Sequence, residues 1–96
     1  MLLDELHQKK TAIEGLARQY GAHNIRVFGS VARGQERPDS DVDFLAELPV
    51  GYDLFTQRMP LAEKLSVLLQ RKVDLIPEHE LNRYLRKHII SEAESL

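Results

Sequence analysis

The chain has no cysteine, and this absence limits the chemistry that its 96 residues can perform. Disulfide bonds, thiolate metal sites and thiol redox chemistry are excluded, and the lack of cysteine agrees with a cytoplasmic location. A basic surplus is missing as well, since 13 Lys and Arg against 15 Asp and Glu give a formal net charge of -2. Because general nucleic-acid binders carry such a surplus, we expect no direct nucleic-acid binding, and a polyphosphate ligand would need metal ions or local backbone amides.

Long hydrophobic runs are also absent. No window approaches the length of a membrane span, and the first five residues include two acidic ones where a signal peptide needs a basic start. We therefore expect a soluble, unprocessed protein that has no membrane partner. A content of 43% hydrophobic and 29% charged residues is typical of a globular chain, and the length suits one domain at 1–96. A chain of this length has no room for a catalytic domain and a separate substrate-binding domain. We therefore expect another molecule to help to hold whatever the protein acts on.

The order of the secondary-structure elements follows from the spacing of the apolar residues. Three- and four-residue spacings favour helices, and alternation favours strands. The expected segments are a helix at 3–20 closed by Gly21, a strand at 25–28, a helical turn at 31–34, a strand at 41–46, a helix capped by Asp53 that kinks or restarts near Pro60 and runs to Leu69, a strand at 72–76, and a helix at 78–94. This order favours an α/β (α+β) fold, a small mixed β-sheet backed by helices.

Two carboxylates, Asp41 and Asp43, lie two residues apart in the second expected strand. Side chains at this spacing project from one face, with backbones about 6 to 7 Å apart. Their hard oxygen ligands suit one or two Mg²⁺ ions, one to activate an attacking hydroxyl and one to hold a triphosphate. Asp74 on the next strand is a third candidate, because it could bind a metal or accept the hydroxyl proton if the two strands are neighbours. The alternative is that these are solvated surface carboxylates.

A Gly-Ser pair stands where the first strand meets the helical turn. Gly29 allows a ligand to approach the backbone closely, and backbone amides together with the Ser30 hydroxyl can meet phosphate oxygens. Arg33 either contacts a phosphate or forms a salt bridge with Glu36 or Asp39. A Gly-Ser pair alone is typical of a simple turn. Together with the downstream carboxylates, it predicts a phosphate-binding turn that faces a metal site.

The two segments together form a recognisable motif. Gly-Ser-Val-Ala-Arg-Gly at 29–34, followed by Ser-Asp-Val-Asp-Phe at 40–44, resembles the signature of the DNA polymerase β-like nucleotidyltransferase superfamily. The resemblance covers residues 25–76, and the length of the chain is similar to that of the minimal nucleotidyltransferases. It implies a polymerase β palm-like core. It also implies ATP as the substrate and Mg²⁺, two ions by expectation, as the cofactor.

The resemblance implies a role for each matching position. Gly29 and Ser30 correspond to residues that hold the triphosphate, and Arg33 is the further nucleotide-binding candidate. The catalytic and metal-binding positions are Asp41, Asp43 and Asp74, of which Asp74 is the third catalytic carboxylate.

Many minimal nucleotidyltransferases neutralise a HEPN-domain ribonuclease toxin by transferring AMP to one of its tyrosines, so the resemblance implies such a partner and an antitoxin role. Two alternatives stay open: a module that neutralises its toxin by occlusion, and a transferase that modifies a small molecule such as an antibiotic. The sequence also leaves two interpretations for Tyr52, Phe55 and Met59, which could form a partner-binding patch or pack into the core.

Overall fold

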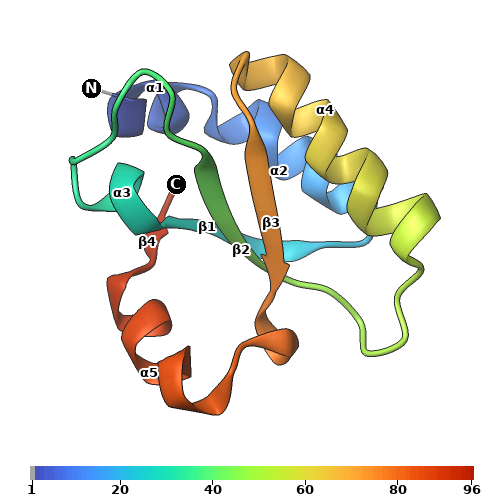
Figure 1. Ribbon diagram of the computed structural model, residues 1–96. Coiled ribbons are helices and arrows are strands. Elements are labelled where there is room, and N and C mark those ends of the chain that lie inside the picture. The colour runs from blue at the N-terminus through green and yellow to red at the C-terminus, as the bar shows by residue number, and fades with distance from the viewer. Residues whose placement is uncertain (1) are drawn as a thin grey trace.

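The computed structural model describes residues 2–96 and contains one four-stranded sheet, in the order β3-β2-β1-β4. The strands are β1 (His23–Phe28), β2 (Val42–Glu47), β3 (Val73–Pro77) and β4 (Glu94–Ser95). β1 is antiparallel to both β2 and β4, whereas β2 and β3 are parallel. The mixed sheet predicted from the sequence is therefore confirmed, with β4 as an additional edge strand (Figure 1).

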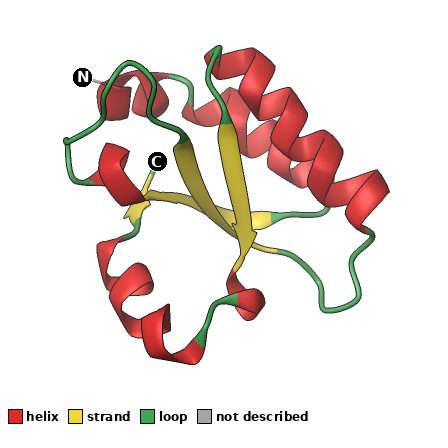
Figure 2. Ribbon diagram, viewed as in Figure 1, coloured by secondary structure: helices red, strands yellow, loops and turns green. Residues whose placement is uncertain are grey.

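Helices surround this sheet unevenly. They are α1 (Leu2–Gln8), α2 (Lys10–Gln19), α3 (Gly29–Ala32), α4 (Met59–Leu69) and α5 (Arg83–Glu92), together with a π-helix η1 (Leu54–Arg58) and a short 3₁₀-helix η2 (Glu78–Glu80). Figure 2 shows α2 and α4 side by side on one side of the sheet, while α5 stands apart from them. In the part of the chain that the structure describes, no helix is long and apolar enough to cross a membrane.

The hydrophobic core lies between the sheet and the helices α1, α2 and α4. Alternation along β2 turns Val42, Phe44 and Ala46 into this core, where all three are fully buried. Asp43 projects from the opposite face. Leu45 shares that face and is fully buried as well, and its register partners on the neighbouring strands are Arg26 and Ile76.

The single helix expected at 3–20 is wrong, because the chain turns at Lys9 and forms α1 and α2. The Lys9 ammonium reaches Glu5 Oε1 at 3.0 Å and the Leu68 carbonyl at 3.4 Å. The prediction that Gly21 closes the helix is confirmed. Gly21 has a φ of 80°, and the following Ala22 amide donates to the Ala17 carbonyl at 2.8 Å, which is the hydrogen-bond pattern of a Schellman motif.

The predicted cap and restart before α4 are both confirmed. Asp53 Oδ1 accepts hydrogen bonds from the Phe55 and Thr56 amides at 2.8 and 2.9 Å, which starts η1. Pro60 lies in the first turn of α4, where its missing N–H is tolerated. Phe55 and Met59 are 75% and 52% exposed, so these two side chains do not pack into the core.

The helix expected at 78–94 is shorter than predicted. Glu78–Glu80 forms η2, and α5 begins only after Asn82, whose side chain accepts a hydrogen bond from the Tyr84 amide at 2.8 Å. After α5 the chain extends, and Ser95 pairs with Arg26 on β1. Apolar spacing could not predict this strand because two residues carry no periodicity.

Candidate active site

Two of the predicted catalytic carboxylates stand on neighbouring strands. The parallel pairing of β2 and β3 sets Asp43 directly beside Asp74, so both side chains project from the face opposite the core. The condition set by the sequence for Asp74, that its strand lies next to the Asp43 strand, is therefore met. Across the other edge of β2, Asp43 is paired with Phe28, the last residue of β1. The chain leaves β1 at this point and enters the Gly-Ser turn.

Burial and neighbouring negative charges both act on the Asp43 carboxyl. Its partial burial raises the pKa of this carboxyl, and the negative charges of Asp74 and Asp41 raise it further, while Arg33 opposes them. Asp41 lies one residue before β2 and is exposed, as is Asp74. The three carboxylates thus interact within one site, and their repulsion is of the kind that a bound cation relieves.

The Gly-Ser turn approaches Asp43 more closely than any other residue type would permit. Gly29 has a φ of 75°, and a Cβ atom at this position would lie 2.2 Å from Asp43 Oδ2. The backbone here is in the left-handed region that only glycine adopts readily. Gly29 and Ser30 then open α3, which contacts both β1 and β2. The structure therefore brings the predicted phosphate-binding turn against the carboxylate site.

Arg33 has a partner that the sequence did not predict. Its guanidinium pairs with Glu92 near the end of α5, and its Nε donates to Gln35 Oε1 at 3.2 Å. The predicted salt-bridge partners Glu36 and Asp39 are therefore wrong. Glu92 is also close enough to contribute to the raised pKa of Asp43, so α5 adds a carboxylate beside the site. No motif could have found it, since Glu92 follows Arg33 by 59 residues.

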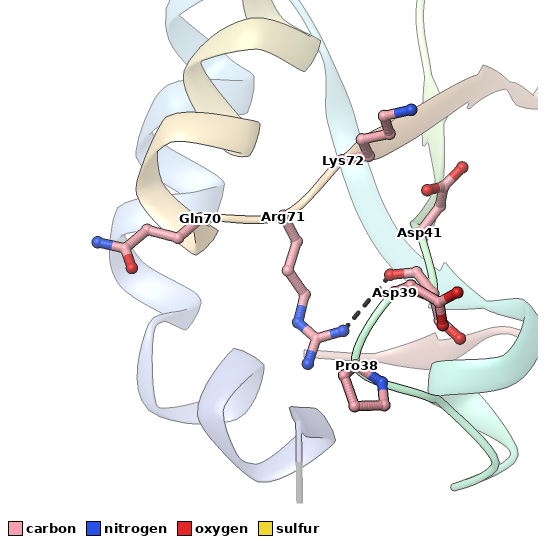
Figure 3. Close-up of a pocket in the computed structure, with 7 residues that line it drawn as sticks. Pro38, Asp39, Asp41, Gln70, Arg71 and Lys72 are labelled. Carbon is pink, nitrogen blue, oxygen red and sulfur yellow. Dashed lines mark hydrogen bonds between the residues drawn. The ribbon is translucent and has the colours of Figure 1, made fainter.

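A second arginine holds the segment that carries Asp41. Arg71, just after α4, donates from Nη1 to the Arg37 carbonyl at 3.1 Å. The same nitrogen donates to the Ser40 carbonyl at 3.4 Å, and Figure 3 marks this second bond with a dashed line. The Val42 amide donates to the Lys72 carbonyl at 2.9 Å in the same region. Asp39 lies in a turn beside Pro38.

The oxygen ligands of the site suit a hard cation such as Mg²⁺, and the repulsion on Asp43 fits the same role. Within residues 2–96, however, no group of three or more histidine or acidic side chains is already arranged to hold an ion. The assignment of Asp41, Asp43 and Asp74 as metal ligands stays a prediction. So do the nucleotide-binding roles of Gly29, Ser30 and Arg33.

The fold and this site define an enzyme of the nucleotidyltransferase class, and comparison with known proteins agrees. Residues 9–96 match the family model described as a nucleotidyltransferase domain, and the chain belongs to this family. The chain is 33% identical over 93 residues to the protein adenylyltransferase MntA of Thermococcus cleftensis. The aligned region covers 96% of this chain and 93% of that relative. A Methanocaldococcus jannaschii protein, provisionally named a protein adenylyltransferase, is 37% identical over 77% of this chain and 76% of its own.

Solved structures share the fold. A protein provisionally described as a minimal nucleotidyltransferase superposes with a TM-score of 0.85 at 38% identity, over 98% of this chain and 95% of that one. A toxin–antitoxin structure with AMP-PNP superposes with a TM-score of 0.72 at 25% identity, over 84% of this chain and 66% of that one. The predicted nucleotidyltransferase fold is therefore confirmed.

Proposed function

We propose that this chain is a magnesium-dependent protein adenylyltransferase, which transfers AMP from ATP to a tyrosine of a cognate HEPN-domain ribonuclease toxin and acts as its antitoxin. The observation that carries the proposal is the row formed by Gly29, Asp43 and Asp74, in which a glycine turn suited to phosphate stands against two paired carboxylates. The similarity to MntA and to a toxin–antitoxin structure with AMP-PNP supports the same activity and the same kind of partner.

Each site residue has a defined task in this reaction. Gly29 and Ser30 bind the triphosphate through backbone amides and the serine hydroxyl, and Arg33 adds a positive charge. Asp41 and Asp43, with Asp74 as a further candidate, would hold Mg²⁺, and the ion would stabilise the charge of the triphosphate. The acceptor hydroxyl gives its proton to the Asp74 carboxylate, and its oxygen forms a bond to the α-phosphorus. The bond from that phosphorus to the bridging oxygen breaks, so that pyrophosphate leaves with the bonding electrons.

The test separates modification from simple occlusion of the toxin. The double variant Asp41→Asn, Asp43→Asn removes two metal ligands and nearly preserves the shape of the surface. It should still bind the cognate toxin in a pull-down, but it should fail to protect RNA from cleavage. Toxin modified by the wild-type protein should stay inactive after the two proteins are separated, because a covalent adduct outlasts the complex.

Two results would contradict the proposal. One is full protection by the double variant, and the other is the recovery of ribonuclease activity as soon as the toxin is separated from the wild-type protein. Either result would favour a module that neutralises the toxin by covering it.

A further inference from the structure

Glu92 is the last residue of α5, and its side chain is only 14% exposed, although every residue at 82–88 of the same helix is exposed. Its carboxylate pairs with the Arg33 guanidinium. After Glu92 the chain returns to the sheet, where Glu94 is paired with Val27 in an antiparallel register. This register places Glu92 beside the end of β1, where the Gly-Ser turn begins, and Figure 1 shows this end of the chain close to α3.

Arg33 stands one helical turn beyond Gly29, because its amide donates to the Gly29 carbonyl at 3.2 Å. Its guanidinium is already engaged, since Nη1 donates to Glu92 and Nε donates to Gln35 Oε1 at 3.2 Å. Arg33 lowers the pKa of the Asp43 carboxyl and Glu92 raises it, so both members of the pair act on the carboxylate site. Glu92 thus occupies the cation that the phosphate-binding turn offers to a nucleotide.

We propose that Glu92 is a positioning residue, which holds the Arg33 guanidinium in the nucleotide-free protein and gives it up to the triphosphate when a nucleotide binds. This inference rests on the proposed nucleotide-binding role of Arg33. Carboxylate and phosphate oxygens accept the same charge-assisted hydrogen bonds from a guanidinium, so the two anions compete for one cation. Glu92 therefore lowers the affinity of the site for a nucleotide and keeps Arg33 beside the turn until the nucleotide arrives.

Removing the charge of Glu92 has two effects on nucleotide binding, and both have the same sign. It frees the guanidinium for the phosphates, and it removes one negative charge from the surroundings of a polyanion. Only the first effect requires Arg33. A double-mutant cycle over Arg33 and Glu92 therefore separates the exchange of partners from general electrostatic repulsion.

The probe is AMP-PNP with Mg²⁺, and its affinity is measured by isothermal titration calorimetry, so that no acceptor is needed. The cycle consists of the wild-type protein, Glu92→Gln, Arg33→Gln and the double variant. Glutamine keeps the shape of the Glu92 side chain and an oxygen that can accept a hydrogen bond from Arg33, which preserves the fold. Glu94→Gln is the matched control, because Glu94 is exposed and loses the same charge two residues further along the chain.

Glu92→Gln should bind AMP-PNP about three- to tenfold more tightly than wild type, while Glu94→Gln stays within about twofold. Arg33→Gln should bind more weakly, and adding Glu92→Gln to it should change the affinity by less than about twofold.

Unchanged or weaker binding by Glu92→Gln would overturn the inference, and so would an equal gain in the Arg33→Gln background. Either result with intact AMP transfer would leave the proposed reaction standing. Tighter binding by Glu92→Gln that depends on Arg33, together with no AMP transfer to any protein, would support the role of Glu92 and contradict the proposed reaction. Failure of both the wild-type protein and Glu92→Gln to bind AMP-PNP would contradict both.

Discussion

At the scale of single residues, burial and neighbouring carboxylates disfavour the ionised form of Asp43. Its carboxyl is half-buried, and the negative charges of Asp74, Asp41 and Glu92 act on it. A raised pKa means that the folded protein prefers the protonated form. In the absence of metal, Asp43 therefore favours folding most below its ordinary pKa of 3.8, and that contribution is lost as the pH rises through the folded-state pKa.

Asp43→Asn should consequently raise the Tm of the metal-free protein at neutral pH, because the amide resembles the protonated carboxyl and removes the repulsion. The gain over wild type should shrink as the pH falls through the raised pKa of Asp43, because the wild-type carboxyl then becomes protonated itself. Thermal unfolding in EDTA across this pH range measures the effect. A variant that is less stable than wild type at neutral pH would contradict the assigned electrostatics.

Gly29→Ala should harm both stability and the site. The left-handed backbone costs a non-glycine residue about 1–2 kcal/mol, and the added Cβ would displace the Asp43 carboxylate. Denaturant unfolding measures the first effect, and AMP transfer should fall further than the stability loss explains. Gly15 is the control, since it lies within α2 with open space around it, and Ala there should stabilise by about 0.5–1 kcal/mol. Equal changes in unfolding free energy and in AMP transfer for Gly29→Ala and Gly15→Ala would contradict the close approach at Gly29.

The sequence predicted which residues lie in the site better than it predicted the residues that they contact. The Gly-Ser turn follows from local spacing and could be expected, whereas the role of Asp74 depended on a strand pairing that the sequence stated only as a condition and that the structure supplies. The pairing of Arg33 with Glu92 depends on where α5 comes to lie, and apolar spacing carries no information about that.

At the scale of elements, the segment before β2 is held from outside by Arg71. Its two hydrogen bonds to main-chain carbonyls tie the turn between α4 and β3 to the residues that precede Asp41. Through them the end of α4 supports the placement of a proposed metal ligand.

Arg71→Ala should therefore loosen this segment and speed amide hydrogen exchange near Asp41. A stability loss of about 1 kcal/mol is expected for the lost hydrogen bonds, together with a lower transfer rate at saturating ATP. Arg18→Ala on the exposed surface of α2 controls for the loss of a positive charge. Unchanged exchange near Asp41 in the Arg71 variant would show that the segment holds its position without these bonds.

Elements with strong local signals were predictable, whereas those created by tertiary packing were not. The cap at Asp53 and the restart at Pro60 depend on neighbouring residues and agree with the sequence. The turn at Lys9 accompanies a contact with the distant Leu68 carbonyl, and β4 exists because β1 offers a free edge. Neither contact leaves a periodic trace in the sequence.

At the scale of the whole molecule, the hydrophobic core lies on one face of the sheet, and the paired carboxylates Asp43 and Asp74 project from the other. Apolar side chains also remain exposed away from the site, among them Val50, Phe55 and Tyr84. With a net charge of only -2, the surface has no general attraction for polyanions. Both features agree with an enzyme that handles its nucleotide through a local site and receives its acceptor from another protein.

The intact mass of the cognate toxin after co-expression tests this account most directly. With the wild-type chain, the toxin should gain the mass of one or more AMP units, located on a tyrosine by fragmentation. With the Asp41→Asn, Asp43→Asn variant, modification should fall by about a hundredfold or more, because the amides bind Mg²⁺ poorly. An unmodified toxin beside the wild-type chain, or equal modification by both proteins, would contradict the claim that these carboxylates catalyse AMP transfer.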